Sequence, residues 1–293
     1  MGWKPVAAAP DTVFAPAKIN LYLHVGNKRA DGYHELESLV VFADVGDELS
    51  FAPADTLSLN VDGRFAAALA NEADNLVLKA ARALAAHVGI EPKARITLTK
   101  NLPVSSGIGG GSADAAATLR GLVKLWQLDI EPKSLAEIAA SLGADVPACL
   151  VGKPLQMGGT GDRLMLLFDF PPLDLLLVNP GAPVSTAEVF RRLEHESGIH
   201  DPGRNTFHDW SALIAYLEKM HNDLEAPAEA AAPVIREVID AICSDPATLI
   251  VRMSGSGATC FGIYGNAQDA AAAADVMRRD HPTWWVTVAR TTA

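Results

Sequence analysis

The sequence has few of the residues that mark secreted, zinc-stabilised or membrane-embedded proteins. It contains only three cysteines, Cys149, Cys243 and Cys260, far apart and without a Cys-x-x-Cys pair, so neither a disulfide framework nor a zinc site is indicated. No apolar run approaches the roughly 18 residues that span a membrane, and the first ten residues lack the apolar core of a signal peptide. We therefore expect a protein of the reducing cytoplasm, without a membrane partner.

Basic charge is also scarce. The chain has 24 Lys and Arg against 35 Asp and Glu, a formal net charge of -11 at pH 7, which argues against a broad nucleic-acid-binding surface. With 293 residues, 49% of them hydrophobic and 20% charged, it is a globular protein long enough for two domains. We expect its partners to be small molecules, so any anion site must be local.

The first half of the chain mixes strand-like and helix-like segments. Residues 19–25 alternate apolar and polar side chains, which is typical of a strand with one buried face. Further strands are expected at 39–42, 57–61 and 96–99, and helices at 75–86, after residue 112 and at 134–143. This order predicts an α+β domain over residues 1–170, ending at the proline-rich joint 169–172.

The second half has a more regular order. Strands are expected at 173–178, 249–253, 259–264 and 284–289, and helices at 187–196, 233–242 and 267–278. Apart from an inserted helical stretch at 210–220, the order is βαββαβ, the ferredoxin-like arrangement. We therefore predict a ferredoxin-like domain over residues 171–293.

A glycine-dense stretch at 103–114 joins the predicted strand at 96–99 to a predicted helix. Ser112 stands where an N-cap is expected, with Asp114 in the first turn. The glycines at 107 and 109–111 let the backbone approach a ligand, while the N–H groups and the positive dipole end of a helix attract an anion. The stretch predicts either a phosphate site or a plain flexible connection.

Two known nucleotide loops do not fit this stretch. A P-loop needs Gly-x-x-x-x-Gly-Lys-Ser/Thr, but the only Gly-Lys pair, at 152–153, is followed by Pro154. A dinucleotide fingerprint would be followed by a second strand with an acidic end, whereas Leu135, Ile138 and Leu142 have helical spacing. The P-loop is therefore excluded, and dinucleotide binding is disfavoured.

Three further features have structural explanations when each is taken alone. Lys18 and Asn20 share the polar side of the first strand, where a solvated strand face is the simplest interpretation. Asp145, between a helix end and Pro147, is favoured as an N-cap. The Gly-Ser-Gly at 255–257 lies between two strands and favours a tight hairpin turn.

Together these segments resemble, in order and position, the three motifs of the GHMP kinases, relatives of galactose, homoserine, mevalonate and phosphomevalonate kinases. The motifs are Pro16-Ala-Lys-Ile-Asn-Leu21, Gly107-Ile-Gly-Gly-Gly-Ser-Ala-Asp114 and Met253-Ser-Gly-Ser-Gly-Ala-Thr259. Residues 29–35, 142–147 and 222–225 resemble the branch that acts on 4-diphosphocytidyl-2-C-methyl-D-erythritol. Over residues 15–289 the resemblance implies a two-domain GHMP kinase fold, with an N-terminal domain like ribosomal protein S5 and a ferredoxin-like C-terminal domain.

The resemblance implies transfer of the ATP γ-phosphate to the 2-hydroxyl of that substrate, in non-mevalonate isoprenoid biosynthesis. Asp145 would accept the hydroxyl proton beside Lys18, an ammonium that within about 4 to 6 Å keeps a carboxylate ionised. Asn20 would hold the acceptor, Asn75 and Lys100 would lie near the adenine, and Ser112 would contact Mg²⁺. The ATP phosphates would lie against Pro103, Val104, Ser105, Ser106, Gly107, Ile108, Gly109, Gly110, Gly111, Ser112 and Ala113.

On the acceptor side, the resemblance implies that Tyr33 and Phe190 sandwich the cytosine of the cytidine diphosphate group, with His34 and Thr186 also binding substrate. From the residues alone, Tyr33 in the core, His34 on the surface and Phe190 packing inward are expected instead. Two other functions stay open: a GHMP kinase for another small alcohol, such as homoserine or mevalonate, and a non-catalytic ligand sensor. The sequence predicts no oligomeric state.

Overall fold

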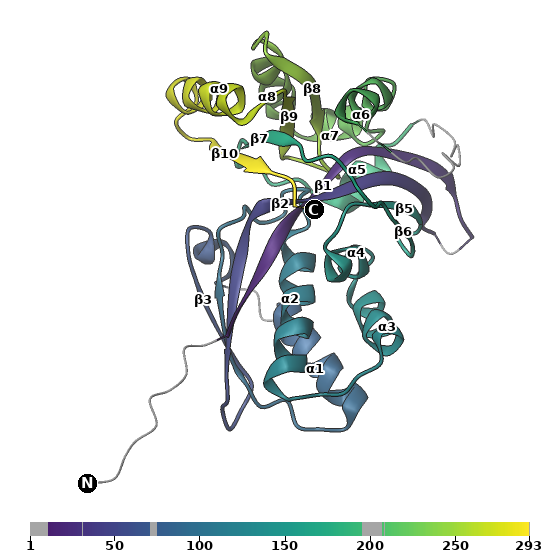
Figure 1. Ribbon diagram of the computed structural model, residues 1–293, viewed down its shortest axis with the longest axis vertical. Helices are drawn as coiled ribbons and strands as arrows, with labels where there is room; N and C mark the ends of the chain where they lie inside the picture. The colour runs from purple at the N-terminus through teal and green to yellow at the C-terminus, as the bar shows by residue number, and fades with distance from the viewer. Residues whose placement is uncertain (1–10, 31, 71–74, 195–206, 208, 293) are drawn as a thin grey trace.

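The protein is built on two β-sheets, as the computed structural model shows (Figure 1). The structure describes residues 11–292 apart from 31, 71–74, 195–206 and 208, so the first ten residues and the end of the helix predicted at 187–196 lie outside the described residues. The six-stranded sheet contains β1 (Asp11–Lys28), β2 (His34–Ala52), β3 (Ser58–Asp62), β4 (Arg95–Thr99), β5 (Leu155–Gly159) and β6 (Arg163–Leu166). The four-stranded sheet contains β7 (Asp174–Asn179), β8 (Thr248–Met253), β9 (Cys260–Tyr264) and β10 (Trp285–Arg290).

Each sheet has its own helices. With the first sheet are η1 (Ala66–Leu69), α1 (Leu76–Val88), α2 (Gly110–Leu125), α3 (Pro132–Leu142) and α4 (Val146–Val151). With the second are α5 (Thr186–Arg191), α6 (Trp210–Leu217), α7 (Glu225–Ala231), α8 (Val234–Cys243) and α9 (Ala267–Asp280). In Figure 1, α1 to α4 lie below the β1–β2 ribbon and α8 and α9 lie above it, so the ribbon separates two helical layers.

The β1–β2 ribbon is antiparallel over almost its full length and extends between the two halves of the molecule. Its strands are far longer than the sequence predicts. Ile19 and Leu21 pack in one core with the second sheet, as the alternating pattern requires. The expectation of a solvated opposite face is wrong: Lys18 and Asn20 are 3% and 1% exposed, because α2 packs against β1 and leaves both side chains in a covered site.

Helix α2 begins earlier than the sequence predicts. Its N-cap is Gly109, in the left-handed region with φ 64°, and not Ser112. Ser112 lies half-buried in the first turn, and Asp114 lies in the second turn, 3% exposed. Because glycine adopts a positive φ without steric cost, the chain enters the helix here without a side-chain cap. The first N–H groups of α2 have no intrahelical acceptor.

The second sheet confirms the predicted ferredoxin-like arrangement. Its strand order is β10-β7-β9-β8, and all neighbouring strands are antiparallel. Helices α5 to α8 lie between β7 and β8 in the chain, and α9 lies between β9 and β10. Helix α6 corresponds to the inserted stretch, whereas α7 was not predicted as a separate helix.

A shared core joins the two sheets. Leu21 of β1 and Leu39 of β2 belong to the same buried cluster as Leu175 and Phe261 of the second sheet. Thr291 forms an isolated bridge with Ala43, so the end of the chain returns to the ribbon. The boundary predicted after residue 170 falls between β6 and β7, and the division into two domains at that point stays a prediction.

Candidate active site

A cavity of about 1340 Å³ lies between the first-sheet helices and the second sheet. The predicted site residues that line it are Lys18, Asn20, Tyr33, His34, Asn75, Lys100, Pro103, Val104, Ser105, Ser106, Gly107, Gly109, Gly110, Gly111, Ser112, Asp145, Thr186 and Phe190. Ile108 and Ala113 instead lie buried behind the loop. The fold thus brings segments from the whole length of the chain to one cavity.

Lys18 and Asp145 form an ion pair in this cavity, with 3.0 Å between Lys18 Nζ and Asp145 Oδ1. Lys18 Nζ also donates to Asn20 Oδ1 at 3.0 Å, and Asn20 Nδ2 donates to Ser38 Oγ at 2.7 Å. The ammonium is therefore fixed from its buried side, while the carboxylate is 38% exposed toward the cavity. Asp145 occupies the N-cap position of α4, as the sequence predicts, but its side chain makes no capping hydrogen bond to the helix and faces Lys18 instead.

The glycine-dense loop packs against Lys18 of β1 and against Lys100, which follows β4, and it leads into the N-terminus of α2. Lys18 N donates to Ile108 O at 2.9 Å, which ties the loop to β1. A Cβ at Gly109 would lie 3.0 Å from Lys18 Cβ, and one at Gly110 would lie 3.1 Å from Lys100 Nζ, whereas one at Gly111 would meet open space. The loop is closely packed on its inner side and open toward the cavity, as a phosphate cradle requires.

The turn between β8 and β9 holds this loop from the opposite side. Ser254 is fully buried, and its hydroxyl donates to Gly107 O at 3.0 Å and accepts from Asn20 N at 3.1 Å. Thr259 N donates to Ser106 O at 3.0 Å. The turn is the hairpin that the sequence predicts, since β8 and β9 are antiparallel. It also connects the loop to the strand that carries Lys18.

The segment 222–225 braces that turn. Asn222 Nδ2 donates to Met253 O and Gly255 O, both at 2.8 Å. Glu225 Oε2 accepts from Met253 N at 2.9 Å, and Asp223 Oδ2 accepts from Val25 N at 2.7 Å. These side chains therefore fix the turn relative to β1, a role that the sequence pattern did not reveal.

Lys100, predicted near the adenine, lies in a buried charge cluster. Its Nζ is 2.5 Å from Asp47 Oδ2 and 2.7 Å from Asp114 Oδ2, and the exposed fractions of the three residues are 2%, 0% and 3%. Burial raises the pKa of the Asp114 carboxyl to about 7, although the Lys100 ammonium opposes this. Burial alone would lower the pKa of Lys100, but the two carboxylates outweigh it and raise that pKa. Lys100 is therefore a cation held by carboxylates, and its contact with a nucleotide stays a prediction.

The other end of the cavity is aromatic and more exposed. Tyr33 is 66% exposed and is not a core residue. The His34 and Phe190 rings have centroids 5.7 Å apart with 35° between their planes, and Phe190 packs partly against the second core. Thr186 Oγ1 and Ser256 Oγ are 2.8 Å apart at the base of α5. This end can offer flat ring surfaces and hydroxyl groups to a ligand.

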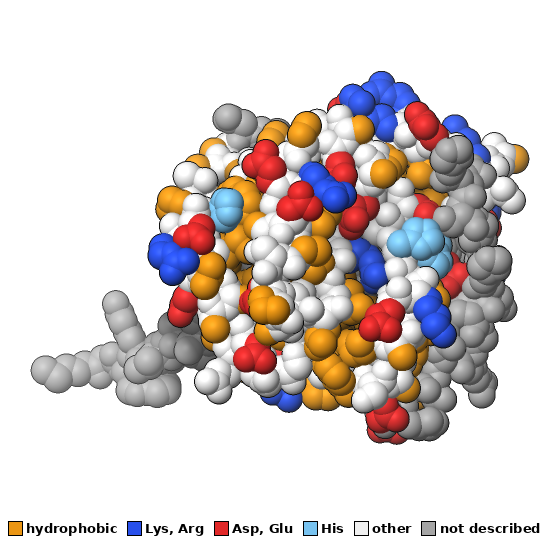
Figure 2. Space-filling view, turned by 90° about the horizontal axis from the view of Figure 1, so that it is seen from above, with side chains coloured by type: hydrophobic (Ala, Val, Ile, Leu, Met, Phe, Trp, Pro, Cys, Tyr) orange, Lys and Arg blue, Asp and Glu red, His pale blue; other side chains and the backbone are white. Residues whose placement is uncertain are grey.

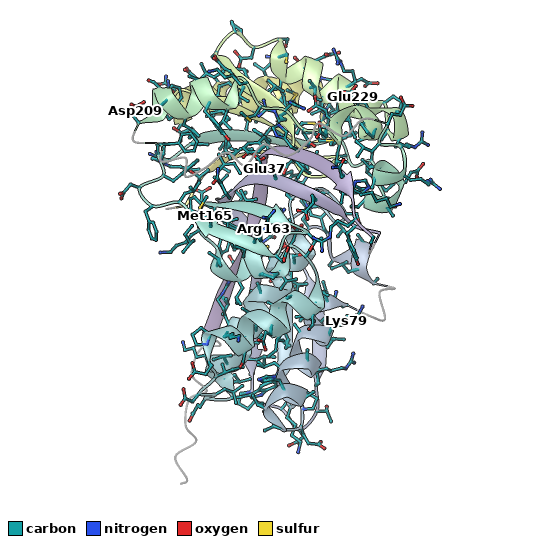
Figure 3. All side chains as sticks on the ribbon, turned by 90° about the vertical axis from the view of Figure 1, so that its right-hand side faces the viewer. Glu37, Lys79, Arg163, Met165, Asp209 and Glu229 are labelled. Atoms are coloured by element: carbon teal, nitrogen blue, oxygen red, sulfur yellow. The ribbon has the colours of Figure 1, made fainter. Side chains whose placement is uncertain are left out.

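Sequence reasoning missed several residues that line the cavity. Leu69, Leu76 and Lys79 line the cavity without having been predicted. They accompany the predicted Asn75, which caps α1 by accepting from Val77 N at 2.9 Å. Figure 3 shows Lys79 on the first-sheet side, below the strand segment with Glu37. Helical spacing from Asn75 could have indicated Lys79, since i and i+4 share a face. Lys28, Arg191 and Ser256 also line the cavity.

The described part of the chain contains no cluster of three His, Cys, Asp or Glu side chains that could hold a metal by itself. Ser112, the predicted Mg²⁺ contact, lines the cavity, and so does the Asp145 carboxylate. Cys149 lies near Asp145 and Lys18, but burial raises the pKa of its thiol to about 12, so the thiol stays protonated. A metal ion here would need further oxygen ligands from a bound phosphate.

Figure 2 shows the end of the molecule where α8 and α9 lie, with acidic and basic side chains interspersed and without a broad basic patch on that face. The described residues include no helix long and apolar enough to cross a lipid bilayer.

Family models and relatives agree with this geometry. The model described as GHMP kinases N terminal domain matches residues 75–153, and the model described as GHMP kinases C terminal matches residues 200–283. The 4-diphosphocytidyl-2-C-methyl-D-erythritol kinase of Parvibaculum lavamentivorans is 51% identical, covering 96% of this chain and 98% of the relative. That of Paramagnetospirillum magneticum is 48% identical, covering 95% of this chain and 98% of the relative.

Solved structures show the same relationship. A crystal structure of 4-(cytidine 5'-diphospho)-2C-methyl-D-erythritol kinase has a TM-score of 0.78 and 32% identity, covering 97% of this chain and all of that one (100%). A homoserine kinase from Cytophaga hutchinsonii has a TM-score of 0.69 but 18% identity, with coverage of 100% and 98%. The second likeness supports the fold alone.

Proposed function

The chain belongs to the GHMP kinase family, among the 4-diphosphocytidyl-2-C-methyl-D-erythritol kinases, and we propose that it transfers the γ-phosphate of ATP to the 2-hydroxyl of that substrate. The products are the 2-phosphate and ADP, in the non-mevalonate route to isoprenoid precursors. The observation that carries the proposal is the Lys18–Asp145 pair, 3.0 Å apart, in one cavity with a glycine-rich loop and an aromatic end.

Asp145 acts as the base in this proposal. Its exposed carboxylate accepts the proton of the acceptor hydroxyl while the hydroxyl oxygen attacks the γ-phosphorus. Lys18 places a fixed positive charge beside the transferring phosphoryl group and stabilises the charge that develops there. Asn20 and Ser38 hold the ammonium in position through consecutive hydrogen bonds of 3.0 and 2.7 Å.

The loop and the N-terminus of α2 fit the ATP phosphates. Gly109 and Gly110 allow the backbone to lie against Lys18 and Lys100, and Gly111 faces open space. The first N–H groups of α2 and its dipole favour an anion. The Ser112 hydroxyl fits a Mg²⁺ ion held mainly by the phosphates; when bound, the ion neutralises phosphate charge. Asn75, Leu76 and Lys79 fit the adenine side of the cavity.

The aromatic end fits the cytosine. Tyr33 and Phe190 supply ring faces, and stacking is worth roughly 1 to 3 kcal/mol per base. His34 Nδ1 is 3.0 Å from Gly26 O, and because a carbonyl only accepts, Nδ1 carries the hydrogen of this contact. The contact holds the His34 ring beside Phe190, where it can adjoin a bound base. Thr186 also lines the cavity, with its hydroxyl 2.8 Å from Ser256 Oγ.

The test is turnover with purified protein, ATP, Mg²⁺ and the diphosphocytidyl substrate, followed by ADP release and ³¹P NMR of the product. A new phosphomonoester on the methylerythritol part supports the proposal, and absence of turnover overturns it. Homoserine and mevalonate serve as competing acceptors, since preferential turnover of either would establish the alternative kinase. Strong inhibition by CDP is expected only of a site that binds cytidine, and so distinguishes this site from that of a homoserine or mevalonate kinase.

A further inference from the structure

Asp47 is fully buried on β2, outside the cavity lining, yet its carboxylate makes three strong contacts. Oδ2 lies 2.5 Å from Lys100 Nζ. Oδ1 accepts from Asn101 N at 2.6 Å and from Leu102 N at 2.8 Å. All three donors belong to residues 100–102, which connect the end of β4 to the glycine-dense loop at 103–114.

The same ammonium reaches the other end of the loop. Lys100 Nζ is 2.7 Å from Asp114 Oδ2, in the second turn of α2. Lys100 Nζ also lies 3.1 Å from the position that a Cβ at Gly110 would occupy. The cluster therefore ties residues 100–102, where the loop begins, to residues 110–114, where it ends.

Fixing both ends of a loop limits the directions in which its N–H groups can point. An anion site that is preorganised in this way loses less conformational entropy when the anion binds. The cluster has a structural cost, because two carboxyl groups and one ammonium are removed from water in the interior. A cluster that served the fold alone could use apolar residues of similar volume.

We propose that Asp47 is a positioning residue for the nucleotide: without touching the ligand, it sets the start of the phosphate loop through Lys100 and the N–H groups of Asn101 and Leu102. This inference rests on the proposed function, because it takes ATP as the ligand of the loop. It assigns Lys100 an action through the loop, in place of direct contact with the adenine.

The two carboxylates offer a matched pair of variants. Both Asp47→Asn and Asp114→Asn replace one of the two carboxyl groups that face the same ammonium with an amide. An amide has one oxygen, so Asn at 47 can serve either Lys100 or the two backbone N–H groups, but not both. Asp114 Oδ1 makes no hydrogen bond with the described residues, so Asn at 114 can place its NH₂ there and keep its oxygen toward Lys100.

We expect Asp47→Asn to raise the KM for ATP about tenfold while the KM for the acceptor stays within about twofold, because loss of a buried charged hydrogen bond acts on the loop alone. Asp114→Asn should change the KM for ATP by less than about threefold. Calorimetric titration with ATP and Mg²⁺, without acceptor, should give the same ratios in Kd. Leu49→Ala, in the core on the same strand, controls for lost stability and should leave both KM values near wild type.

Equal effects of the two Asn variants would overturn the proposal, because charge would then matter and the backbone contacts would not. Tighter ATP binding in both would indicate that Lys100 contacts the nucleotide directly. If Asp47→Asn does not fold, the double variant Asp47→Asn/Lys100→Gln provides a Gln oxygen that can accept from the NH₂ group of Asn at 47. An ATP affinity of this double variant within about threefold of wild type supports the proposal. A tenfold loss in Asp114→Asn alone would contradict it. Failure of the wild-type protein to bind ATP would instead refute the proposed function.

Discussion

The two ends of the cavity are constructed differently. At the phosphate-loop end, Lys18, Lys100, Asp47 and Ser254 are almost fully buried, and each makes short polar contacts that the fold already provides. At the aromatic end, Tyr33 is 66% exposed. The first end is set during folding, whereas the second has ring surface that is still in contact with water.

This difference separates positioning from affinity. Buried, hydrogen-bonded groups keep a fixed geometry and so can align a phosphoryl group with its acceptor. Exposed rings gain their energy only when a base covers them, since stacking and removal of apolar surface from water occur on binding. We therefore expect substitutions at the phosphate-loop end to change the reaction rate or ATP affinity, and those at the aromatic end to change acceptor affinity.

The sharpest test of this separation is Asp145→Asn, for which we expect the largest effect. The amide cannot accept the hydroxyl proton, so kcat should fall by about three orders of magnitude, within the range for loss of a general base. The Kd for ATP, measured by calorimetry, should stay within about threefold of wild type. The shape of Asn matches Asp, so a loss of fold should not contribute, and unchanged thermal unfolding provides the control. Turnover close to wild type would refute the role of Asp145 as base.

The aromatic end can be tested by Tyr33→Ala, with an intermediate effect. Loss of one stacking face should raise the KM for the diphosphocytidyl substrate about 30-fold, since stacking contributes roughly 1 to 3 kcal/mol per base. The KM for ATP should change less than about twofold. Tyr33→Phe keeps the ring and is the matched control, with near-normal kinetics expected. Equal increases in both KM values would contradict a cytosine site at this end.

Much of the fold could be predicted from the sequence, because its periodicities are local. The ferredoxin-like order of the second half follows from alternating strand and helix patterns, and the structure confirms it. The burial of the polar face of the β1–β2 ribbon could not be predicted in the same way. Lys18 and Asn20 alternate with apolar residues as on a solvated strand, but helix α2 covers their face. Only tertiary packing decides that point.

The site shows the same limit. Lys18 and Asp145 are 127 positions apart, and their 3.0 Å contact has no local signal; the family resemblance brought them together, not their spacing. Ser112 was predicted as the cap of α2, but glycine at 109 enters the helix by its own left-handed conformation. Asp47 carries no motif, since it acts on backbone N–H groups that any sequence has. Such contacts become visible only in three dimensions.

The separation between the two ends should be weakest at the β8–β9 turn, which contacts both. Ser254→Ala removes one hydroxyl that serves Asn20 N and Gly107 O. Because an unpaired buried polar group costs about 1 to 3 kcal/mol, part of which the turn can relieve by a small shift, we expect the KM values for ATP and acceptor to rise together, each about fivefold.

Ser256→Ala is the matched control in the same turn. It removes the hydroxyl that lies 2.8 Å from Thr186 Oγ1 and leaves the contact with Gly107 in place. It should therefore raise the acceptor KM alone, by about threefold, the size of effect expected for a neutral hydrogen bond of modest net strength. If Ser254→Ala changed only one of the two KM values, the turn would serve only one end of the cavity. The two ends would then be more independent than the double contact of the Ser254 hydroxyl, with Asn20 N and Gly107 O, indicates.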